Sequence, residues 1–446
     1  MNKAFISIKL RQHQLKRGRK EIEMVRGKKR VLISILGSLL VWLFLASSLW
    51  AADADVADLI NLLKSKNIVT QEEADALLKE ASTNSQKERK EIKEDIMKSA
   101  AKGDFVPPAL KGFKVGTTVF AEWNSKDIHN GASTNQFVLN RAYLSLTKDV
   151  NDWLGLNVTT DIFTSKDTDD KGNGWEVRLK NAYANINLLG TTTLAGLIPT
   201  PSDTYDSAIW PYRVQGKHLL DETGVQSSAD FGISNQGTFG GYMDDEYLKF
   251  ASKPFAGKWG GYIIGIYNGA GYSNSEANQN KVVSGLVYLR PLPTVPVLKG
   301  FQLAYTGTYG KTNTKFATGN TNDYPNWEMN IAQASLQHKM FTIMGQYYWG
   351  KATATSSEQN KREGYLADAF VRIPGLEKLR LFGKYYDYDP NTDKDNDKYK
   401  TYVGGLSYDL SKEFMLFTAY ENRKYEVSTA SASDYNQYQI GFQLKF

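Results

Sequence analysis

Three side chains suited to binding anions lie close together in the longest polar connection of the chain, residues 200–226. They are Arg213, Lys217 and His218, and fixed cations of this kind select solutes by charge without making or breaking bonds. The same connection contains apolar residues that favour packing over free solvation: Trp210, Pro211, Leu219 and Leu220. The alternative is a surface loop in which the two basic residues have no special role.

Further charged side chains fall on one face of the strands predicted below. The basic ones are Lys114, Arg141, Arg290, Arg372, Arg380, Lys384 and Arg423. The acidic ones are Glu122, Asp161, Asp230, Asp368 and Glu421. A ladder of basic groups would favour anions, but pairing of opposite charges across an interior explains this mixed set equally well. The sequence therefore leaves anion preference and phosphate specificity open.

An acidic stretch near the C-terminus, DYDPNTDKDNDK at 387–398, has carboxylates at alternate positions. The candidates for holding a divalent cation are Asp387, Asp389, Asp393 and Asp395. An EF-hand loop needs Gly at its sixth position and Glu at its twelfth, where this stretch has Thr392 and Lys398. We therefore expect a solvated loop tip and no dedicated metal site, with loose divalent bridging to lipopolysaccharide as the alternative.

Catalytic groups and cofactor ligands are sparse. The four histidines are His13, His129, His218 and His338, and no compact Ser–His–acid pattern or metal-ligand spacing includes them. The absence of Cys excludes disulfides, thiolate zinc sites and haem attached through Cys-x-x-Cys-His. We predict neither enzyme activity nor a cofactor; a lipase would need a Ser paired with His129 or His218.

The charge balance separates the first 51 residues from the rest. They carry 11 Lys and Arg against 2 Glu, whereas residues 52–446 carry 43 basic and 46 acidic side chains. A basic run before the apolar stretch VLISILGSLLVWLFLASSLW, followed by small residues, is typical of a secretory signal peptide. We predict a signal peptide over 1–51, with Met24 as an alternative start and an uncleaved anchor as the alternative. The rest of the chain lacks the basic excess that nucleic-acid binding needs.

Residues 52–112 have a helical pattern. Thr70 and Glu73 form a capping box before an apolar run. The charged stretch QKERKEIKEDIMKSA has two isoleucines four residues apart, which fits either a short coiled coil or a solvated helical linker. The sequence PPALKG at 107–112 ends this region, so we expect a helical segment that precedes a second domain over 113–446.

From Phe113 onward, apolar residues recur at every second position, which is the period of a β-strand. The connections alternate between tight turns and long polar loops, which is the asymmetry of a transmembrane barrel. Residues 240–253 break this pattern, and we expect them to extend a strand or add a hairpin. About sixteen strands are predicted, near 113–125, 135–149, 153–165, 175–189, 191–199, 227–239, 258–270, 280–291, 301–311, 327–339, 341–351, 363–373, 379–389, 397–410, 414–426 and 436–446.

The two faces of each strand differ as expected of a barrel in a membrane, with apolar residues toward lipid and polar residues toward water. In 301–309 the outward residues are Phe301, Leu303, Tyr305 and Tyr309, and the inward ones are Gln302, Thr306 and Thr308. Aromatic residues near strand ends predict interfacial belts: Trp123, Tyr288, Trp349, Tyr386 and Tyr408. After residue 52 no apolar run is long enough for a transmembrane helix, so we expect an all-β transmembrane barrel.

The chain ends on YQIGFQLKF, whose apolar residues alternate with polar ones. We expect this strand to close the barrel against the first strand. A Phe-terminated strand of this kind resembles the recognition signal of the outer-membrane barrel assembly machinery. The residues that would carry the signal are Tyr438, Phe442, Leu444 and Phe446.

Five stretches resemble the phosphate-selective porin family (O and P) of Gram-negative outer-membrane porins, or its uncharacterised relatives: NRAYLSL at 140–146, LKNAYANINL at 179–188, AGLIPTP at 195–201, SSADFGI at 227–233 and YNGAGY at 267–272. The resemblance covers most of residues 55–446. It implies a sixteen-stranded, often trimeric channel whose third long loop folds into the lumen. Arg213, Lys217 and His218 would then lie at the narrowest point, and the helical segment would lie in the periplasm.

Two functions fit these expectations. The first is a porin that lets small hydrophilic solutes or ions diffuse passively, with an open question of anion preference. The alternative is a barrel that sheaths a partner, such as a multihaem cytochrome in an electron conduit. The expected partners are outer-membrane lipid and lipopolysaccharide, the barrel assembly machinery, and further copies of the chain in a homotrimer; nucleic acid is not expected.

Overall fold

The computed structural model of the protein describes residues 64, 66, 70–80, 83, 87, 112–164, 175–251, 253–317, 323–429 and 432–446. The chain divides into two compact units, Met1–Lys111 and Gly112–Phe446, which are taken one at a time. The predicted signal peptide over 1–51 and the candidate coiled coil over 86–100 lie outside the described residues, apart from Lys87.

In the first unit, residues 71–80 form a helix that begins after Thr70. The Thr70 backbone N donates to Glu73 Oε2 at 2.8 Å, and the Glu73 backbone N donates to Thr70 Oγ1 at 3.3 Å. The predicted capping box is therefore confirmed. Because these donors favour the ionised carboxylate, the pKa of Glu73 lies below its ordinary value.

None of the helices in the described part of the chain is long and apolar enough to cross a membrane.

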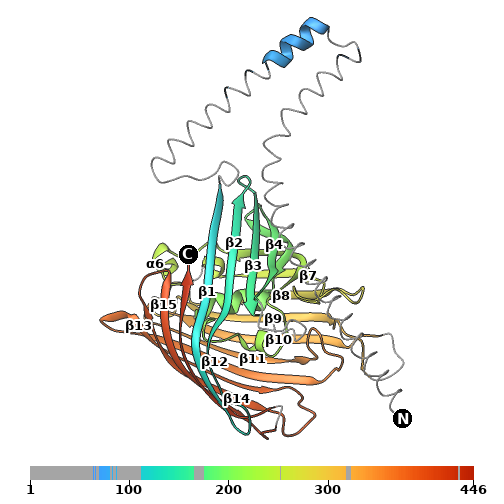
Figure 1. The fold of residues 1–446 in the computed structure, drawn as a ribbon. Coiled ribbons are helices and arrows are strands. Elements are labelled where there is room, and N and C mark those ends of the chain that lie inside the picture. Colours follow the sequence, from blue (N-terminus) through green and yellow to red (C-terminus); the bar gives the residue numbers. More distant parts are fainter. Residues whose placement is uncertain are drawn as a thin grey trace, which may run out of the picture. The chain divides into compact units, whose positions relative to one another are not determined.

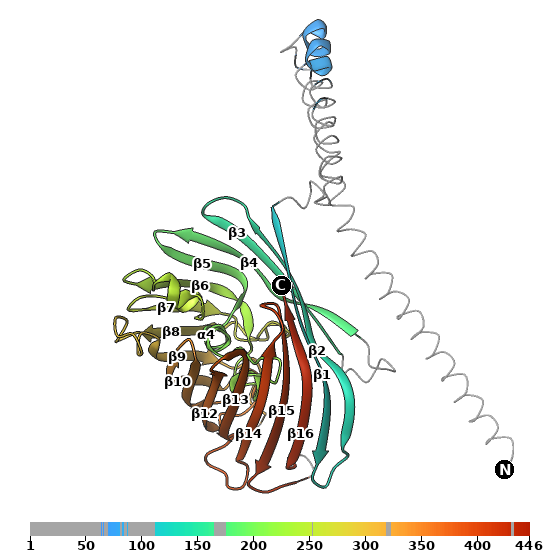
Figure 2. The same cartoon turned by 90° about the vertical axis from the view of Figure 1, so that its left-hand side faces the viewer.

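The second unit is a closed antiparallel barrel of sixteen strands within the described residues (Figure 1). Figure 2 shows the same ring of strands from the side, with a short helix inside it. The predicted number of strands is confirmed. The strands are β1 (Phe113–Ile128), β2 (Thr134–Asp149), β3 (Leu154–Thr164), β4 (Trp175–Leu188), β5 (Thr191–Pro199), β6 (Ala229–Phe239), β7 (Gly260–Tyr267), β8 (Val282–Leu289), β9 (Phe301–Lys311), β10 (Asn326–Gln337), β11 (Phe341–Lys351), β12 (Lys361–Ile373), β13 (Leu376–Asp389), β14 (Tyr399–Asp409), β15 (Phe414–Tyr425) and β16 (Tyr435–Lys445).

The last strand closes the ring against the first, as the sequence predicts. The pairing of β1 with β16 runs from Thr118 opposite Lys445 to Ile128 opposite Tyr435. The terminal residue takes part as well, because the Phe446 N–H donates to the Thr117 carbonyl at 3.0 Å and the Thr117 N–H donates back at 2.7 Å. The backbone of the terminal strand is thus paired on both sides, which a chain in a hydrocarbon environment requires.

Short turns gather at one end of the barrel. Five turns at one end are short, and they span 150–153, 189–190, 338–340, 374–375 and 410–413. The connection over 240–259 lies at the same end but contains two short helices, α6 (Asp245–Leu248) and η2 (Lys253–Phe255), and one isolated bridge. The expectation of an extended strand or hairpin there is wrong. Gly240 and Gly241 both have positive φ, +72° and +76°, which ends β6 and turns the chain.

The outer and inner faces alternate as predicted. On β9, Leu303, Tyr305 and Tyr309 point outward and are 42–47% exposed, whereas Gln302 and Thr308 point inward and are fully buried. Three outer aromatic pairs form part of a belt across β11–β16: Tyr347–Tyr365, Tyr385–Tyr402 and Tyr420–Tyr438, with ring centroids 4.7–5.1 Å apart.

Two of the predicted belt residues lie inside the barrel instead. Tyr288 and Tyr386 are only 1% and 2% exposed, whereas Trp349 and Tyr408 remain outside. The prediction of an outer position for Tyr288 and Tyr386 is wrong, because both lie on the inward parity of their strands beside buried neighbours such as Leu286 and Phe382. Aromatic residues occur on both faces here, so residue type alone does not identify the belt.

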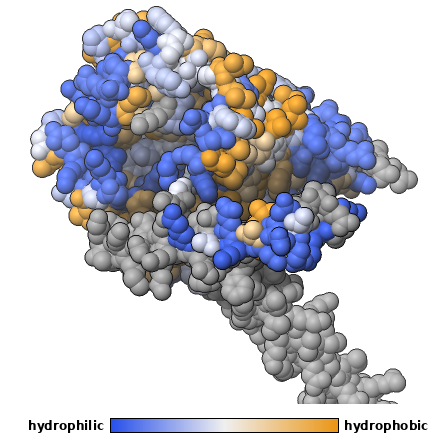
Figure 3. Space-filling view, turned by 90° about the horizontal axis from the view of Figure 1, so that it is seen from above, coloured by the Kyte–Doolittle hydropathy of each residue, from blue (hydrophilic) through white to orange (hydrophobic). Residues whose placement is uncertain are grey.

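The interior has two sides of different character. We call the inner faces of β7–β14 the packed side, because apolar side chains form a continuous core there. Its members include Leu286, Met329, Ile331, Met344, Leu366, Phe370 and Phe382. We call the inner faces of β16 and β1–β4 the open side; these faces carry mainly polar and charged residues. Seen from above, the barrel is hollowed, with hydrophilic residues along one side of the hollow and hydrophobic ones along another (Figure 3).

Candidate functional site

The connection between β5 and β6, residues 200–228, runs through the interior and packs along the wall. It begins with helix α4 (Pro201–Ile209), where Pro201 occupies the first turn and needs no N–H partner. Trp210 follows and is 1% exposed, with its ring 6.4 Å from those of Phe370 and Phe382. Tyr212 stacks on Phe382 at 4.1 Å. The apolar residues of this connection therefore pack as their character predicts.

Hydrogen bonds attach the same connection to the wall at several strands. The Tyr205 hydroxyl donates to Gln302 Oε1 on β9 at 2.9 Å, and the Tyr212 hydroxyl lies 2.8 Å from Ser407 Oγ on β14. Gln346 on β11 donates to the Asp206 carboxylate. These contacts hold residues 200–215 against the packed side.

A polar cavity of about 370 Å³ remains between this connection and the open side. Strands β1, β2, β15 and β16 supply one wall, and residues 213–217 with Glu222 supply the other. Its charged lining residues are Glu122, Arg141, Arg213, Lys217, Glu222 and Glu421. The structure therefore brings several of the predicted charges together in one water-accessible space.

Two basic residues of the connection share a single acid. Arg213 Nη2 lies 2.7 Å from Asp221 Oδ2, and Lys217 Nζ lies 3.3 Å from Asp221 Oδ1. Asp221 belongs to the short helix α5 (Leu219–Glu222), which places it one turn after Lys217. Two cations on one carboxylate leave a net positive charge beside the cavity.

The facing wall repeats this arrangement. Asp161 on β3 is fully buried and accepts from Arg141 Nη1 on β2 at 3.1 Å and from Arg178 on β4 at 2.8–2.9 Å. Close by, Lys180 Nζ donates to Ser228 Oγ at 3.2 Å. Strands β2 and β4 thus add positive charge to the same side of the interior.

Arg178 and Lys180 were missed by the sequence-based selection of residues. The signal was present, because they alternate with Val177 and Leu179, which are 66% and 41% exposed on the outer face. Assigning the faces of residues 175–189 by this alternation would have placed both cations inside. A bulge opposite Thr159 and Thr160 shifts the register beyond Lys180, which makes this strand harder to assign than its neighbours.

Acidic groups border the cavity on its other flank, and hydrogen bonds hold each of them. Glu222 accepts from Arg423 and from the Tyr386 hydroxyl. Glu421 Oε2 accepts from Gln215 Nε2 at 2.9 Å. Glu122 accepts similarly from Gln439. Among the charged residues that line the cavity, the bases therefore lie on β2 and residues 213–217, and the acids lie on β1, β15 and α5.

His218 lies outside this cavity. It is 3% exposed, and its Nε2 is 3.2 Å from Ser207 Oγ. Burial and the neighbouring cations Arg213 and Lys384 hold the pKa of His218 well below its ordinary value. Since a Ser–His nucleophile depends on forming imidazolium, these surroundings argue against a hydrolytic role for Ser207 and His218.

Other predicted wall charges are occupied with structural contacts. Arg290 is fully buried and donates to backbone carbonyls. Lys384 Nζ donates to the Lys217 carbonyl at 3.3 Å, which ties β13 to the connection. Asp368 is 1% exposed on the packed side, and Asp230 accepts from the Gly269 N–H at 2.6 Å.

The remaining basic candidates lie toward the short-turn end. Arg380 pairs with Asp409, and Arg372 Nη1 donates to the Lys339 carbonyl at 2.8 Å. Lys114 pairs with Asp149 at 2.7 Å, with both side chains well exposed. Arg372 and Lys114 therefore contribute little charge near the cavity.

Ion pairs neutralise part of the acidic stretch over 387–398. Three of its carboxylates face lysines: Asp387 and Lys400 at 3.5 Å, Asp389 and Lys398 at 3.1 Å, and Asp393 and Lys361 at 3.3 Å. Asp395 is exposed. Among the described residues, no group of three or more His, Asp or Glu side chains is placed to hold a metal ion.

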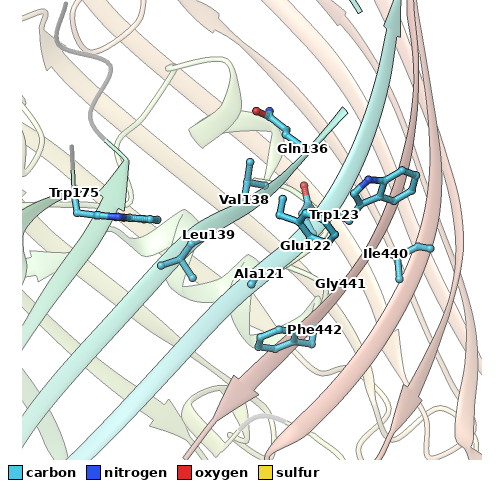
Figure 4. A pocket seen from close by; sticks show the side chains of 11 residues that line it. Ala121, Glu122, Trp123, Gln136, Val138, Leu139, Trp175, Ile440, Gly441 and Phe442 are labelled. Atoms are coloured by element: carbon cyan, nitrogen blue, oxygen red, sulfur yellow. The ribbon is translucent and has the colours of Figure 1, made fainter. Parts of the chain in front are cut away.

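A larger hollow of about 940 Å³ lies on the outer surface over β1, β2 and β16 (Figure 4). Trp175 of β4 points across it toward Leu139 of β2 (Figure 4). Phe137, which also lines it, is 87% exposed. This lining is mainly apolar, so the hollow differs in kind from the polar cavity inside the barrel.

Comparisons with known proteins support the fold. No protein-family model matches the sequence, and no curated protein matches it. Three solved structures cover 75% of this chain each: the anion-selective porin from Comamonas acidovorans (TM-score 0.53, 14% identity, 99% of that chain), OprB from Pseudomonas putida (0.52, 8%, 94%) and the outer membrane channel DcaP of Acinetobacter baumannii (0.50, 12%, 97%). At these identities the likeness shows a shared barrel fold, and the phosphate-selective family remains a prediction.

Proposed function

We propose that this protein is a porin of the Gram-negative outer membrane that lets small hydrophilic solutes and ions diffuse passively, with residues 200–228 as the constriction. Support comes from the polar cavity of about 370 Å³ that runs beside this connection. A sixteen-stranded barrel is wide enough to enclose an aqueous channel. Two of the three structural neighbours are named as a porin and as an outer membrane channel, which agrees with this proposal.

The observation that carries an anion preference is the sharing of one acid by two bases in two groups, which reach the cavity through Arg213 and Lys217 and through Arg141. Arg213 and Lys217 share Asp221, and Arg141 and Arg178 share Asp161. Each group keeps an excess positive charge, and fixed charges beside a constriction favour counter-ions.

The acids Glu122, Glu222 and Glu421 border the same space. Because they oppose a concentrated array of cations, we propose a general anion preference rather than phosphate specificity.

The packed side argues against the sheath alternative. A barrel that encloses another protein needs its lumen for that partner. Here the inner faces of β7–β14 are covered by an apolar core of the chain itself. This core includes Trp210 and Tyr212 of the connection. The interior therefore suits small solutes better than a protein guest.

The proposed location follows from the barrel's faces and ends. After cleavage of the predicted signal peptide, the segment before residue 113 would lie in the periplasm with the short turns, and the long loops would face lipopolysaccharide. The outer aromatic belt would meet the lipid interface. The barrel assembly machinery would recognise the terminal strand through Tyr438, Phe442, Leu444 and Phe446, all of which lie on its outward parity.

We further propose that the barrel forms a homotrimer through the outer face of β4–β6. Small residues face outward there: Ala184 is opposite Ala195, which is opposite the exposed Ile233. Small side chains allow close approach of another wall. The aromatic pairs of the belt lie instead on β11–β16, which marks that region as the lipid-facing part.

The test is conductance of the purified protein in planar bilayers, with reversal potentials measured across a KCl gradient and with phosphate added as a blocker. We expect stable channels with an anion-to-cation permeability ratio above unity. Arg213→Ala, Lys217→Ala and Lys180→Gln should each lower the ratio by about two- to fivefold, because a partly exposed charge contributes about 0.5–1 kcal/mol.

Lys400→Gln is the matched control, since this lysine lies on β14 and pairs with Asp387 away from the cavity. Its permeability ratio should equal that of the unmodified protein. A ratio that stays unchanged in all three lumen variants would remove the constriction assignment, and absence of conductance would remove the channel itself.

A further inference from the structure

The connection between β6 and β7, residues 240–259, is longer than the five short turns at the same end of the barrel. It folds back on itself through the isolated bridge between Tyr242 and Gly257. Asp244 caps helix α6 by accepting from the Tyr247 backbone N at 2.7 Å, and the Tyr247 side chain of this helix is buried. A connection at this end therefore reaches into the barrel.

Aromatic contacts anchor residues 240–259 to the inner face of the packed side. Phe255 is 3% exposed, and its ring lies 4.8 Å from that of Tyr205 on α4 and 5.5 Å from that of Tyr288 on β8. Tyr247 is fully buried, and its hydroxyl lies 3.5 Å from Gln337 Oε1 on β10. The segment is thus wedged between helix α4 and the wall.

Arg290 holds the segment by hydrogen bonds to its backbone. Its guanidinium donates to the carbonyls of Gly257 at 3.2 Å, Phe255 at 2.9 Å and Lys299 at 2.9 Å. The same group lies 4.6 Å from the centre of the Tyr247 ring. A fully buried arginine needs partners for its donors, and here two backbone carbonyls of the segment and that of Lys299 supply them. The charge of Arg290 therefore holds the segment in place and does not face the lumen.

The wall beside this segment is buried. Gln337, which Tyr247 contacts, is 5% exposed, and Ser335, two residues earlier on the inner face of β10, is 3% exposed. On the open side, by contrast, Gln437 lines the polar cavity. The segment enters from the short-turn end, whereas residues 200–228 enter from the long-loop end, and the two meet at the Phe255–Tyr205 contact.

We infer that residues 240–259 are a second constriction element, which seals the interior along β8–β10 and supports α4, so that solutes pass only along the open side. The inference rests on the proposed channel function. It assigns Tyr247, Phe255 and Arg290 as positioning residues, which act on the flow through the placement of α4 and not through contact with solute.

Cysteine accessibility tests the inference directly, because the natural chain contains no Cys. Ser335→Cys places a thiol on the wall beside the segment, and Gln437→Cys places one on the open side. A charged methanethiosulfonate reagent is applied to each full-length channel in a bilayer. We expect Gln437→Cys to react and lose most of its current, and Ser335→Cys to keep its current. Equal block of both variants would overturn the inference.

Removing the segment gives the complementary test. Phe239 pairs with Gly260, so Asn-Gly can replace residues 240–259 as a two-residue hairpin turn. We expect single-channel conductance to rise by roughly 1.5- to 2-fold, since a wider polar lumen conducts more, and Ser335→Cys to become reactive in this background. The matched control shortens the exposed loop over 390–398 in the same way and should leave conductance unchanged.

The outcomes separate the two proposals. Lack of conductance in the unmodified protein removes the porin proposal. Normal conductance that the shortened turn does not alter, or a reactive Ser335→Cys in the intact chain, removes only the second constriction. If the shortened variant fails to fold, the pair of cysteine variants in the intact chain still decides.

Discussion

The packed side and the open side are built on the same alternating strands, but their inner faces differ in kind. On β10 and β11 the inward residues Met329, Ile331 and Met344 are at most 2% exposed. On β1 and β2 the inward residues include Glu122 and Arg141, which line a polar cavity. The polarity of an inner face therefore follows from what lies against it, which is protein on one side and water on the other.

The strands of the packed side consequently bury apolar residues on one face and expose them on the other. On β11, Ile343 is 52% exposed outside whereas Met344 is 1% exposed inside. Each buried Met, Ile or Phe side chain contributes about 1.5–3 kcal/mol relative to an exposed one. The interior connection is thus held by an ordinary protein core, which gives a rigid support for the charged residues of the open side.

The strongest test of the difference between the two sides is to place a carboxylate on the packed side and another on the open side. Ile331→Asp puts a carboxylate into the core and should cost at least about 4 kcal/mol of unfolding free energy, because no partner is available for a buried charge. Urea unfolding followed by the loss of heat-modifiable gel mobility measures this. Gln437→Asp on the open side is the control and should change stability by less than about 1 kcal/mol. Similar losses in both variants would abolish the distinction.

The buried acid of the open side gives the next largest effect. Asp161→Asn leaves Arg141 and Arg178 without their shared carboxylate, which should cost about 3–5 kcal/mol, the usual result of breaking a buried ion pair. The surviving channels should prefer anions more strongly. Bilayer selectivity and urea unfolding of one preparation check both effects. Asp149→Asn, in the exposed pair with Lys114, should cost no more than about 1 kcal/mol.

The strands and their faces could be predicted because period-two alternation is local. The predicted range 301–311 coincides with β9, and 341–351 coincides with β11. The capping box at Thr70 is equally local, since it depends on residues three apart. The closing strand was recognised from its own alternation.

What the sequence could not predict depends on contacts between distant residues. Parity places Arg290 and Tyr288 on an inner face, but the segment over 240–259 covers both, and its path is set by Phe255 and Tyr247 meeting other strands. For the same reason Arg213 and Lys217 could be proposed for the lumen whereas the burial of His218 could not. Alternation assigns a face to a residue without saying whether water or protein lies against that face.

A third prediction concerns pH at the junction of α4 with the packed side. Burial, together with nearby Asp203 and Asp368, raises the pKa of Asp206 well above its ordinary value. The folded protein therefore holds this proton more tightly, and stability from this group is lost as pH rises from about 3.9, the ordinary Asp pKa, through the raised value. Asp206→Asn should be more stable than the unmodified protein at pH 7 by about 1–3 kcal/mol and similar to it below pH about 3.9.

Asp323→Asn is the control with the opposite sign. The Tyr324 backbone N–H lowers the pKa of this exposed carboxyl, so its contribution is present at neutral pH and is lost as pH falls. Urea midpoints between pH 3.5 and 8 compare the two variants. A parallel response to pH in both would contradict the burial of Asp206 against β11 and β12.

The smallest effect on stability is expected at Lys217, whose backbone carbonyl accepts a hydrogen bond from the side chain of Lys384. Lys384 Nζ donates to the Lys217 backbone carbonyl, which every Lys217 variant retains. Lys217→Gln should therefore change stability by no more than about 0.5 kcal/mol, since its partly exposed i,i+4 pair with Asp221 is weak, while lowering anion preference. Lys384→Met removes the donor itself and should cost about 1–3 kcal/mol with little change in selectivity. If Lys217→Gln destabilised the barrel as much as Lys384→Met, or left selectivity unaltered, structural support and ion selectivity would not be divided between the packed side and the open side.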